Sequence, residues 1–157
     1  MECLAEALSL RRRSVSCLLS KGPFHAAAIF SRNNSALLAY GENTYYVGDV
    51  SNKWTVHAES SAIDRLPTQP RRKRLVSVDM LVIRTSRTGC LGQSRPCVHC
   101  IITMCRTLPL RGYKLDRIYY SDENQKIQMI KLHDLVHDEH QHVTMFYKTR
   151  RMRNLCI

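Results

Sequence analysis

The chain has 157 residues, of which 44% are hydrophobic and 24% are charged. This length and composition suit one globular domain and exclude a disordered chain. The formal net charge of +11 favours an anionic partner, either a nucleic acid or a phosphorylated substrate. No stretch approaches the roughly 18 apolar residues of a membrane span, so we expect no membrane partner. The seven cysteines are an odd set with no apolar signal-peptide core before them, which predicts a reducing intracellular compartment, the cytoplasm or the nucleus.

The first part of the chain predicts a helix, a hairpin and a second helix. Apolar residues recur at helical spacing near the start, and the polar turn over 31–35 separates two short apolar runs. In chain order we expect a helix over 1–20, strands over 25–30 and 36–40, a polar and aromatic loop over 41–56, and a helix over 57–66.

The second part alternates strands and helices. The continuous apolar run over 78–83 is typical of a central strand buried on both faces. Ser121 ends one of the strands and is expected at the substrate cleft, because ligands bind at strand ends in open α/β sheets. The expected elements are a strand over 76–85, a helix over 96–108, a strand over 117–121, a helix or a strand plus helix over 127–137, and a strand over 143–148. This order predicts a three-layer α/β/α fold with a mixed sheet of about five strands.

Two short motifs stand at the starts of predicted helices: His57-Ala58-Glu59 and Pro96-Cys97-Val98-His99-Cys100. Cys97 and Cys100 are three residues apart, so their sulfur atoms lie on one helical face. Two thiolates and one imidazole can fill three corners of a tetrahedral zinc site and leave the fourth for water, which is the arrangement of a catalytic zinc. Glu59, two residues from His57, would stand near that water and could accept its proton.

The order H-x-E followed by P-C-x-x-C resembles the signature of the cytidine deaminase superfamily, the zinc-dependent nucleobase deaminases. The similarity extends to the predicted element order over about residues 24–121. It implies a single CMP/dCMP-type deaminase domain over 1–157, whose core is flanked by basic segments. It implies zinc held by His57, Cys97 and Cys100, catalysis by Glu59, and substrate contacts at Asn43, which follows the second strand, and at Ala58.

The implied reaction is hydrolysis of a C–N bond in a cyclic amidine. Zinc-bound hydroxide would attack C4 of cytosine or C6 of adenine, while Glu59 shuttles protons until ammonia leaves. The segment HAESSAI over 57–63 is similar to the HAE-x-N-A-I segment of deoxycytidylate deaminases, with Ser61 in place of the Asn. We therefore expect conversion of cytosine to uracil in a (deoxy)cytidine nucleotide, by a protein that can form homo-oligomers.

Two other functions remain open. Basic clusters at 11–13, 71–74 and 148–153 exceed what one phosphate needs, which favours an editing deaminase that acts on RNA or DNA. Three rings in the predicted loop, those of Tyr45, Tyr46 and Trp54, can stack a base. The other alternative is a non-catalytic zinc-containing module that binds nucleic acid. A closed structural zinc site with Cys90 as fourth ligand would leave Glu59 unexplained.

Several other histidines and cysteines receive structural interpretations. His133 and His137 in HDLVH are similar in spacing to a metalloprotease helix, but the acid between them is an Asp, one carbon shorter than the required Glu. The segment 133–142 is therefore interpreted as solvated surface. His99 is expected at the surface or toward substrate, and Cys105 in the core.

Overall fold

The computed structural model describes residues 24–47, 53–70 and 74–143. These ranges contain the strands β1 (Phe24–Ser31), β2 (Leu37–Glu42), β3 (Thr44–Val47), β4 (Lys53–Val56), β5 (Val76–Thr85), β6 (Leu91–Gly92), β7 (Tyr113–Ser121) and β8 (Ile127–Lys131). They also contain the helices α2 (Ala58–Arg65), α3 (Val98–Leu110) and α4 (Leu132–Val136). No helix within these ranges has the length and hydrophobicity that a membrane crossing requires.

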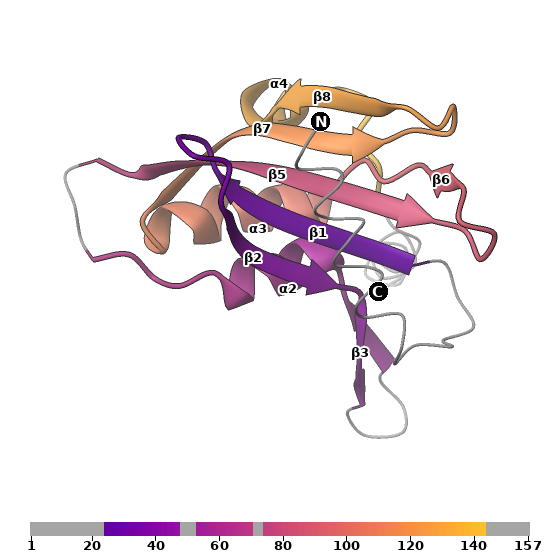
Figure 1. Cartoon of the computed structure of the whole chain (residues 1–157), viewed down its shortest axis with the longest axis horizontal. Coiled ribbons are helices and arrows are strands. Elements are labelled where there is room, and N and C mark those ends of the chain that lie inside the picture. The colour runs from indigo at the N-terminus through magenta and orange to yellow at the C-terminus, as the bar shows by residue number, and fades with distance from the viewer. Residues whose placement is uncertain (1–23, 48–52, 71–73, 144–157) are drawn as a thin grey trace, which may run out of the picture.

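The main sheet has the strand order β2-β1-β5-β7-β8, with the short β6 paired to β5 (Figure 1). Strands β5 and β7 are parallel, whereas the other pairs are antiparallel. This mixed sheet with flanking helices confirms the predicted α/β class and the prediction of about five strands.

The strand directions bring the starts of two helices to the same edge of the sheet. Both β2 and β5 pair antiparallel with β1, so they point the same way. The chain reaches α2 after β2 and α3 after β5, and α3 belongs to the crossover that the parallel pair β5 and β7 requires. His57 and Cys97, which precede these helices, therefore share one edge.

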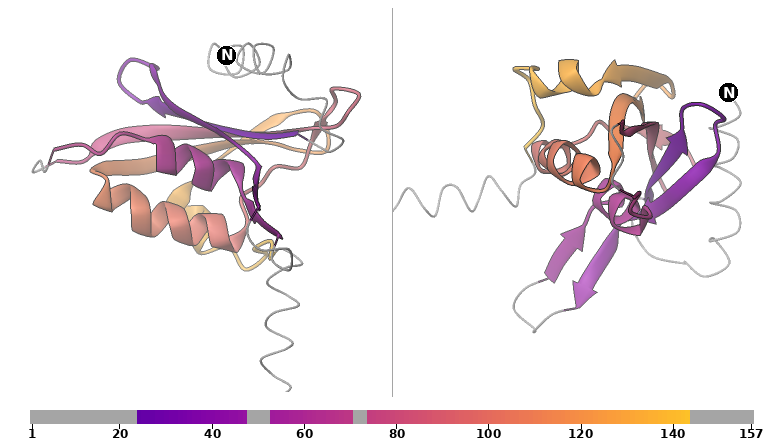
Figure 2. Two further views of the ribbon diagram at one scale, coloured as in Figure 1. Left: turned by 90° about the horizontal axis from the view of Figure 1, so that it is seen from below. Right: turned by 90° about the vertical axis from the view of Figure 1, so that its left-hand side faces the viewer.

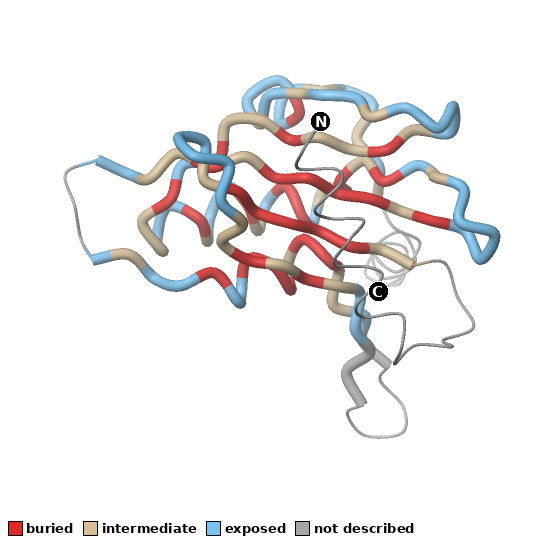
Figure 3. Tube along the Cα trace, in the orientation of Figure 1, coloured by how far each residue is buried: buried red, intermediate tan, exposed pale blue. Residues whose placement is uncertain are grey.

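Strand β5 is central, as its apolar run predicts, and it is buried on both faces (Figure 3). On one face, Val78, Met80 and Val82 belong to the main hydrophobic core. On the other, Leu81 and Ile83 belong to a second, smaller cluster. Alternation along a strand sends successive side chains to opposite faces, so an apolar run supplies both clusters.

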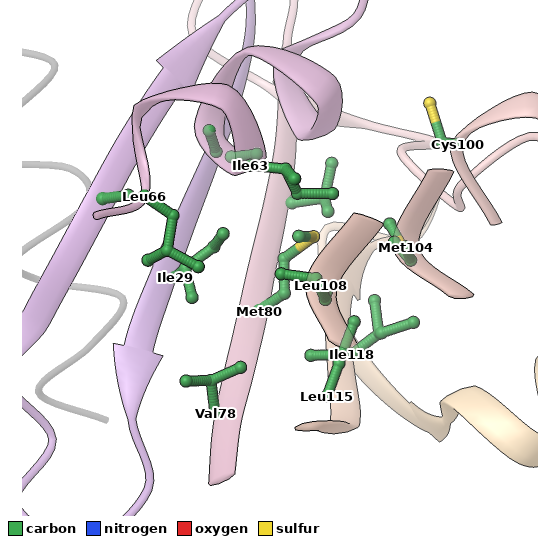
Figure 4. Packing of buried hydrophobic residues seen from close by; sticks show 14 of the residues in the cluster. Ile29, Ile63, Leu66, Val78, Met80, Cys100, Met104, Leu108, Leu115 and Ile118 are labelled. Carbon is green, nitrogen blue, oxygen red and sulfur yellow. The ribbon is translucent and has the colours of Figure 1, made fainter. Parts of the chain in front are cut away.

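Helices α2 and α3 pack side by side on the main-core face of the sheet (Figure 2). Cys100, Met104 and Leu108 are four residues apart and form the buried stripe of α3 (Figure 4). Leu135 of α4 joins the same core, so every helix of the described ranges contributes to one face. The helix predicted over 1–20 lies outside these ranges.

Gly41 marks the closest approach between the sheet and α2. A Cβ at this position would lie 2.2 Å from the backbone N of Ala62 and 2.5 Å from the carbonyl oxygen of Ala58. Since real Cβ atoms do not come so close to backbone, only glycine fits there without moving the helix. This contact sets the distance at which α2, and the motif at its start, stands from β2.

The prediction of a loop over 41–56 is wrong, because β3 and β4 form a hairpin there. Thr44 pairs with Val56, and Val47 with Lys53, in a ribbon that projects away from the main sheet (Figure 2). Both strands are rich in β-branched and aromatic residues, which favour extended backbone even in a polar setting. The predicted stacking of Tyr45, Tyr46 and Trp54 concerns side chains outside the described part.

The structure also settles the C-terminal elements. Residues 127–137 form a strand followed by a helix, one of the two predicted possibilities. The strand predicted over 117–121 begins earlier, at Tyr113, because buried Tyr113 and Leu115 alternate with exposed Lys114. From residue 144 onward, the strand predicted over 143–148 lies outside the described residues, as do the basic clusters at 11–13 and 148–153 and most of the one at 71–74.

Candidate metal centre and its cavity

His57 and Cys97 occupy equivalent positions, each as the N-cap residue of its helix. Both have extended backbone, with φ −70° and ψ 152° at His57 and φ −81° and ψ 164° at Cys97. Neither side chain makes a capping hydrogen bond to its own helix, so both side chains are available for other contacts. Cys100, one turn into α3, is fully buried.

These three residues converge and are called here the metal cluster. The Nδ1 of His57 lies 3.2 Å from the Sγ of Cys100 and 3.5 Å from the Sγ of Cys97. All three ligand atoms lie within 4.8 Å of one another. Ligands of a tetrahedral zinc, at their usual bond lengths, are about 3.5–3.8 Å apart. The cluster can therefore hold one metal ion.

The protonation of the cluster is shared among its members. The pKa of Cys97 is lowered to about 4, chiefly by its hydrogen bond with Cys100 and against the effect of burial, with His57 adding to the shift. The pKa of Cys100 is raised, because Cys100 keeps the proton shared with Cys97 and is buried. The pKa of His57 is raised, above all by its hydrogen bond with Cys97. A metal ion would take the place of these shared protons.

Glu59 stands beside the cluster with only 4% of its surface exposed. Burial raises the pKa of its carboxyl, while its own backbone N–H and His57 act in the opposite sense. A carboxyl group in so dry a place has an elevated proton affinity, which is a property of groups that pass protons during catalysis.

Asn43 connects the cavity to the start of α2. Its side-chain oxygen accepts a hydrogen bond of 2.8 Å from the backbone N–H of Ala58. Asn43 thus supplies the cap that His57 does not make. The side chain of Ala58 is fully buried in the main core, and its predicted substrate contact stays a prediction.

A polar cavity of about 680 Å³ opens over the cluster, and His57, Glu59, Cys97 and Asn43 line it. The remaining lining side chains come from strand ends and loops. The basic ones are called here the cavity wall and are His25, Arg84, Arg95, His140 and His142; Gln93, Ser94 and Glu123 complete the lining. The cavity therefore has the carboxyl of Glu59 and sulfur groups at the cluster, and mostly basic groups around them, with the carboxyl of Glu123 among these.

The cavity wall is the part of the site that no motif predicted. His140 and His142 are exposed, as expected for the solvated segment 133–142, and they also line the mouth of the cavity. The carbonyl oxygen of His142 accepts a hydrogen bond from the N–H of Val98 at the start of α3, and Asp138 forms an ion pair with Arg95. These contacts join residues more than 40 positions apart, and sequence spacing carries no signal for them.

His25 is another wall residue, on β1 opposite Arg84 of β5. Burial, together with the positive charges of Arg84 and His57, lowers the pKa of His25 to about 4. At neutral pH this imidazole is therefore uncharged, and Arg84 is the positive charge at this point of the wall.

Other candidate residues lie elsewhere. Cys90 is exposed and is not a member of the metal cluster, so the closed zinc site that would use it does not form. Cys105 is exposed on α3, which corrects its expected place in the core. His99 is exposed and does not line the cavity. Ser121 is fully buried beneath the cavity rather than lining it.

No protein-family model matches the chain, and no curated protein sequence matches it. Among solved structures, the chain is similar to a dCMP deaminase from the cyanophage S-TIM5 in apo form, with 18% sequence identity and a TM-score of 0.36. The match covers 62% of this chain and 65% of that chain, which is less than two thirds of its length. A similarity of this size establishes neither family nor activity, so the interpretation of the site rests on its own residues.

Proposed function

We propose that this protein is a zinc-dependent hydrolase that deaminates a nucleobase, with the cytosine of a (deoxy)cytidine nucleotide as its substrate. The observation that carries this proposal is the convergence of one imidazole and two thiols, with the carboxyl of Glu59 beside them, in one polar cavity. A purely structural zinc site has four protein ligands and needs no carboxyl group next to it.

The donor set fits zinc rather than a harder ion. Thiolate sulfur and imidazole nitrogen suit zinc, whereas magnesium and calcium prefer oxygen. His57, Cys97 and Cys100 would hold the ion, at separations that the cluster already has. When bound, zinc would supply Lewis acidity and a water of lowered pKa.

Glu59 is the residue that moves protons in the proposed reaction. In a hydrolytic deamination, a water oxygen bonds to the ring carbon, the bond from that carbon to the amino nitrogen breaks, and ammonia leaves. Glu59 would take one proton from the water and pass it to the ring nitrogen, and would then take the second proton, from the hydroxyl now on the ring carbon, and pass it to the departing amine. Burial supports this role, since it raises the proton affinity of the carboxyl.

The proposal is tested with zinc-loaded protein and a panel of cytosine and adenine compounds: base, nucleoside, monophosphate and short oligonucleotide. Ammonia release is the readout. We expect Glu59→Gln to lower turnover by about 10²–10⁴-fold, the usual contribution of a positioned acid–base group, with zinc content unchanged. Glu139→Gln, the same change at an exposed position outside the cavity lining, is the matched control.

Equal ammonia release by Glu59→Gln and the unmodified protein would contradict the role of Glu59. No ammonia from any compound in the panel, with zinc bound, would instead favour the non-catalytic nucleic-acid-binding module.

A further inference from the structure

Two histidines at α4 stand apart from the metal cluster and from the lining of its cavity: His133 of the helix and His137, its C-cap residue. Residues four apart on a helix lie on the same side, and Leu135 between them is only 1% exposed in the main core. The helix also contacts β7 and β8 (Figure 1). α4 is therefore anchored by Leu135, while both histidines are exposed to solvent, with 79% of the His133 side chain accessible.

Internal hydrogen bonds fix which nitrogen of each ring carries the proton. The Nδ1–H of His137 donates to the carbonyl oxygen of His133 at 2.8 Å, and the Nδ1 of His133 lies 3.3 Å from the carboxylate Oδ1 of Asp134. Both acceptors have no proton to give, so a neutral ring keeps its proton on Nδ1 and its lone pair on Nε2. Within the described residues, no hydrogen bond uses either Nε2 atom. Histidines that bind metals are oriented in this way, by a carboxylate or a carbonyl on the other ring nitrogen.

The distance between the two rings suits one shared metal ion. The ring centroids of His133 and His137 are 4.4 Å apart, and the ring planes are inclined by 33°. With metal–nitrogen bonds of about 2.0–2.1 Å, two imidazoles at right angles around one ion have centroids about 4.5 Å apart, and two at the tetrahedral angle about 5.2 Å. The observed separation matches the right angle, which square-planar and octahedral ions prefer.

The charges near the pair favour a cation. The segment 133–139 contains three acidic residues, Asp134, Asp138 and Glu139, and no lysine or arginine, in a chain whose net charge is +11. Asp138 is paired with Arg95, whereas Asp134 faces the ring of His133. The histidine pair therefore lies in a locally acidic part of a basic protein, where a divalent cation is not repelled.

From this geometry we propose that His133 and His137 form a second metal site, which binds one divalent ion of the Ni²⁺ and Cu²⁺ class through the two Nε2 atoms. Imidazole suits both ions, and both stand near the strong-binding end of the divalent series. Water would fill the other coordination positions. The site takes no part in the proposed deamination, and its ion would tie His137 to the preceding turn of α4.

The test titrates Ni²⁺ calorimetrically into full-length protein whose metal cluster has first been saturated with zinc. Zinc content is measured before and after the titration. We expect one Ni²⁺ ion per chain with the zinc retained. His133→Ala and His137→Ala should each weaken Ni²⁺ binding at least about tenfold, since even loss of an outer-shell partner costs roughly 10–100-fold. His140→Ala, which removes an exposed histidine of the same segment outside the pair, is the matched control and should bind Ni²⁺ as the unmodified protein does.

A further variant tests the carboxylate beside the pair. Asp134→Asn keeps an acceptor oxygen near Nδ1 of His133 but removes its charge, so Ni²⁺ affinity should fall about tenfold, the lower end of the effect of an outer-shell partner. Glu139→Gln removes an exposed carboxylate that bonds to neither ring and should have a smaller effect. Equal effects of the two changes would contradict the orienting role of Asp134.

Thermal unfolding gives a second readout. An ion that binds only the folded chain raises the melting temperature. Ni²⁺ should therefore raise it in the zinc-saturated protein and in His140→Ala, but not in the double variant that carries His133→Ala and His137→Ala. Both positions are exposed, so the variants should fold, and their melting temperatures without Ni²⁺ check this.

Two results would overturn the second site. Equal losses of Ni²⁺ affinity in His140→Ala and His137→Ala would mean that exposed histidines bind the ion without regard to the pair. Unchanged binding by the double variant, with zinc released, would place Ni²⁺ in the metal cluster instead. Neither result depends on ammonia release, so failure of the proposed deamination would leave this test intact.

Discussion

The metal cluster and the cavity wall differ in how the chain builds them. His57 and Cys97 cap two helices that start at one edge of the sheet, and Cys100 is buried one turn further on. The wall residues come from strand ends and from loops, and the side chain of His140 is 91% exposed. The cluster is therefore held by the main core, whereas much of the wall is held by a few hydrogen bonds and one ion pair.

Under the proposed function, this contrast assigns the chemistry to the metal cluster and the binding of the substrate to the cavity wall. Atoms that must stand within a few ångströms of one another are placed on helices, which packing keeps rigid. Groups that recognise the rest of a substrate can sit on loops and strand ends, where substitutions do not disturb the core. Changes to the cluster should therefore affect metal content and turnover, and changes to the wall should affect binding.

The largest effect is expected from Cys100→Ala. The substitution removes a buried ligand, so the affinity for zinc should fall by more than the roughly 10–100-fold that loss of an outer-shell partner costs, and activity should fall with it. Metal content by atomic spectroscopy is the readout. Cys105→Ala, an exposed cysteine on the same helix, should retain its zinc. Equal zinc content in the two variants would break the assignment of Cys100 to the cluster.

Gly41→Ala should have the next largest effect, because it acts on the packing that places α2. A Cβ there would collide with the helix backbone at 2.2 Å, and such overpacking costs about 1–3 kcal/mol or more. The free energy of unfolding in urea is the measurement. Gly92→Ala, where the nearest atom would be 3.6 Å away, should change it by about 0.5 kcal/mol or less. Similar losses in both variants would mean that Gly41 does not set the position of α2.

Asn43→Ala tests the role of the residue that lines the cavity and caps α2. Loss of its hydrogen bond to Ala58 should cost about 1 kcal/mol of stability, as for other helix caps, and the KM for the substrate should rise. Asn34→Ala removes a comparable bond in the turn between β1 and β2 and should leave the KM unchanged. A KM that is unaffected by Asn43→Ala would restrict Asn43 to the capping role.

The limits of local reasoning are visible at particular residues. The apolar run of β5 correctly predicted a central strand, because a strand that is buried on both faces needs apolar side chains at successive positions. The sequence analysis predicted a loop where β3 and β4 form a hairpin. The aromatic and β-branched residues of both segments favour strands, but the polar residues between the segments favoured the prediction of a loop. Ser121 was expected at the cleft from its place at a strand end, but its hydroxyl is taken up by bonds to Arg84 and Gly92.

The amino-acid sequence by itself determined the metal cluster and its acid. Spacing within C-x-x-C places Cys97 and Cys100 on one helical face, and the resemblance of the H-x-E and P-C-x-x-C order to a known signature added His57 and Glu59. Only the tertiary structure decided that Arg84, His140 and His142 line the same cavity. Their meeting depends on strand register and on how the segment after α4 returns to the start of α3. Those relations arise from packing between distant parts of the chain, which short-range patterns do not encode.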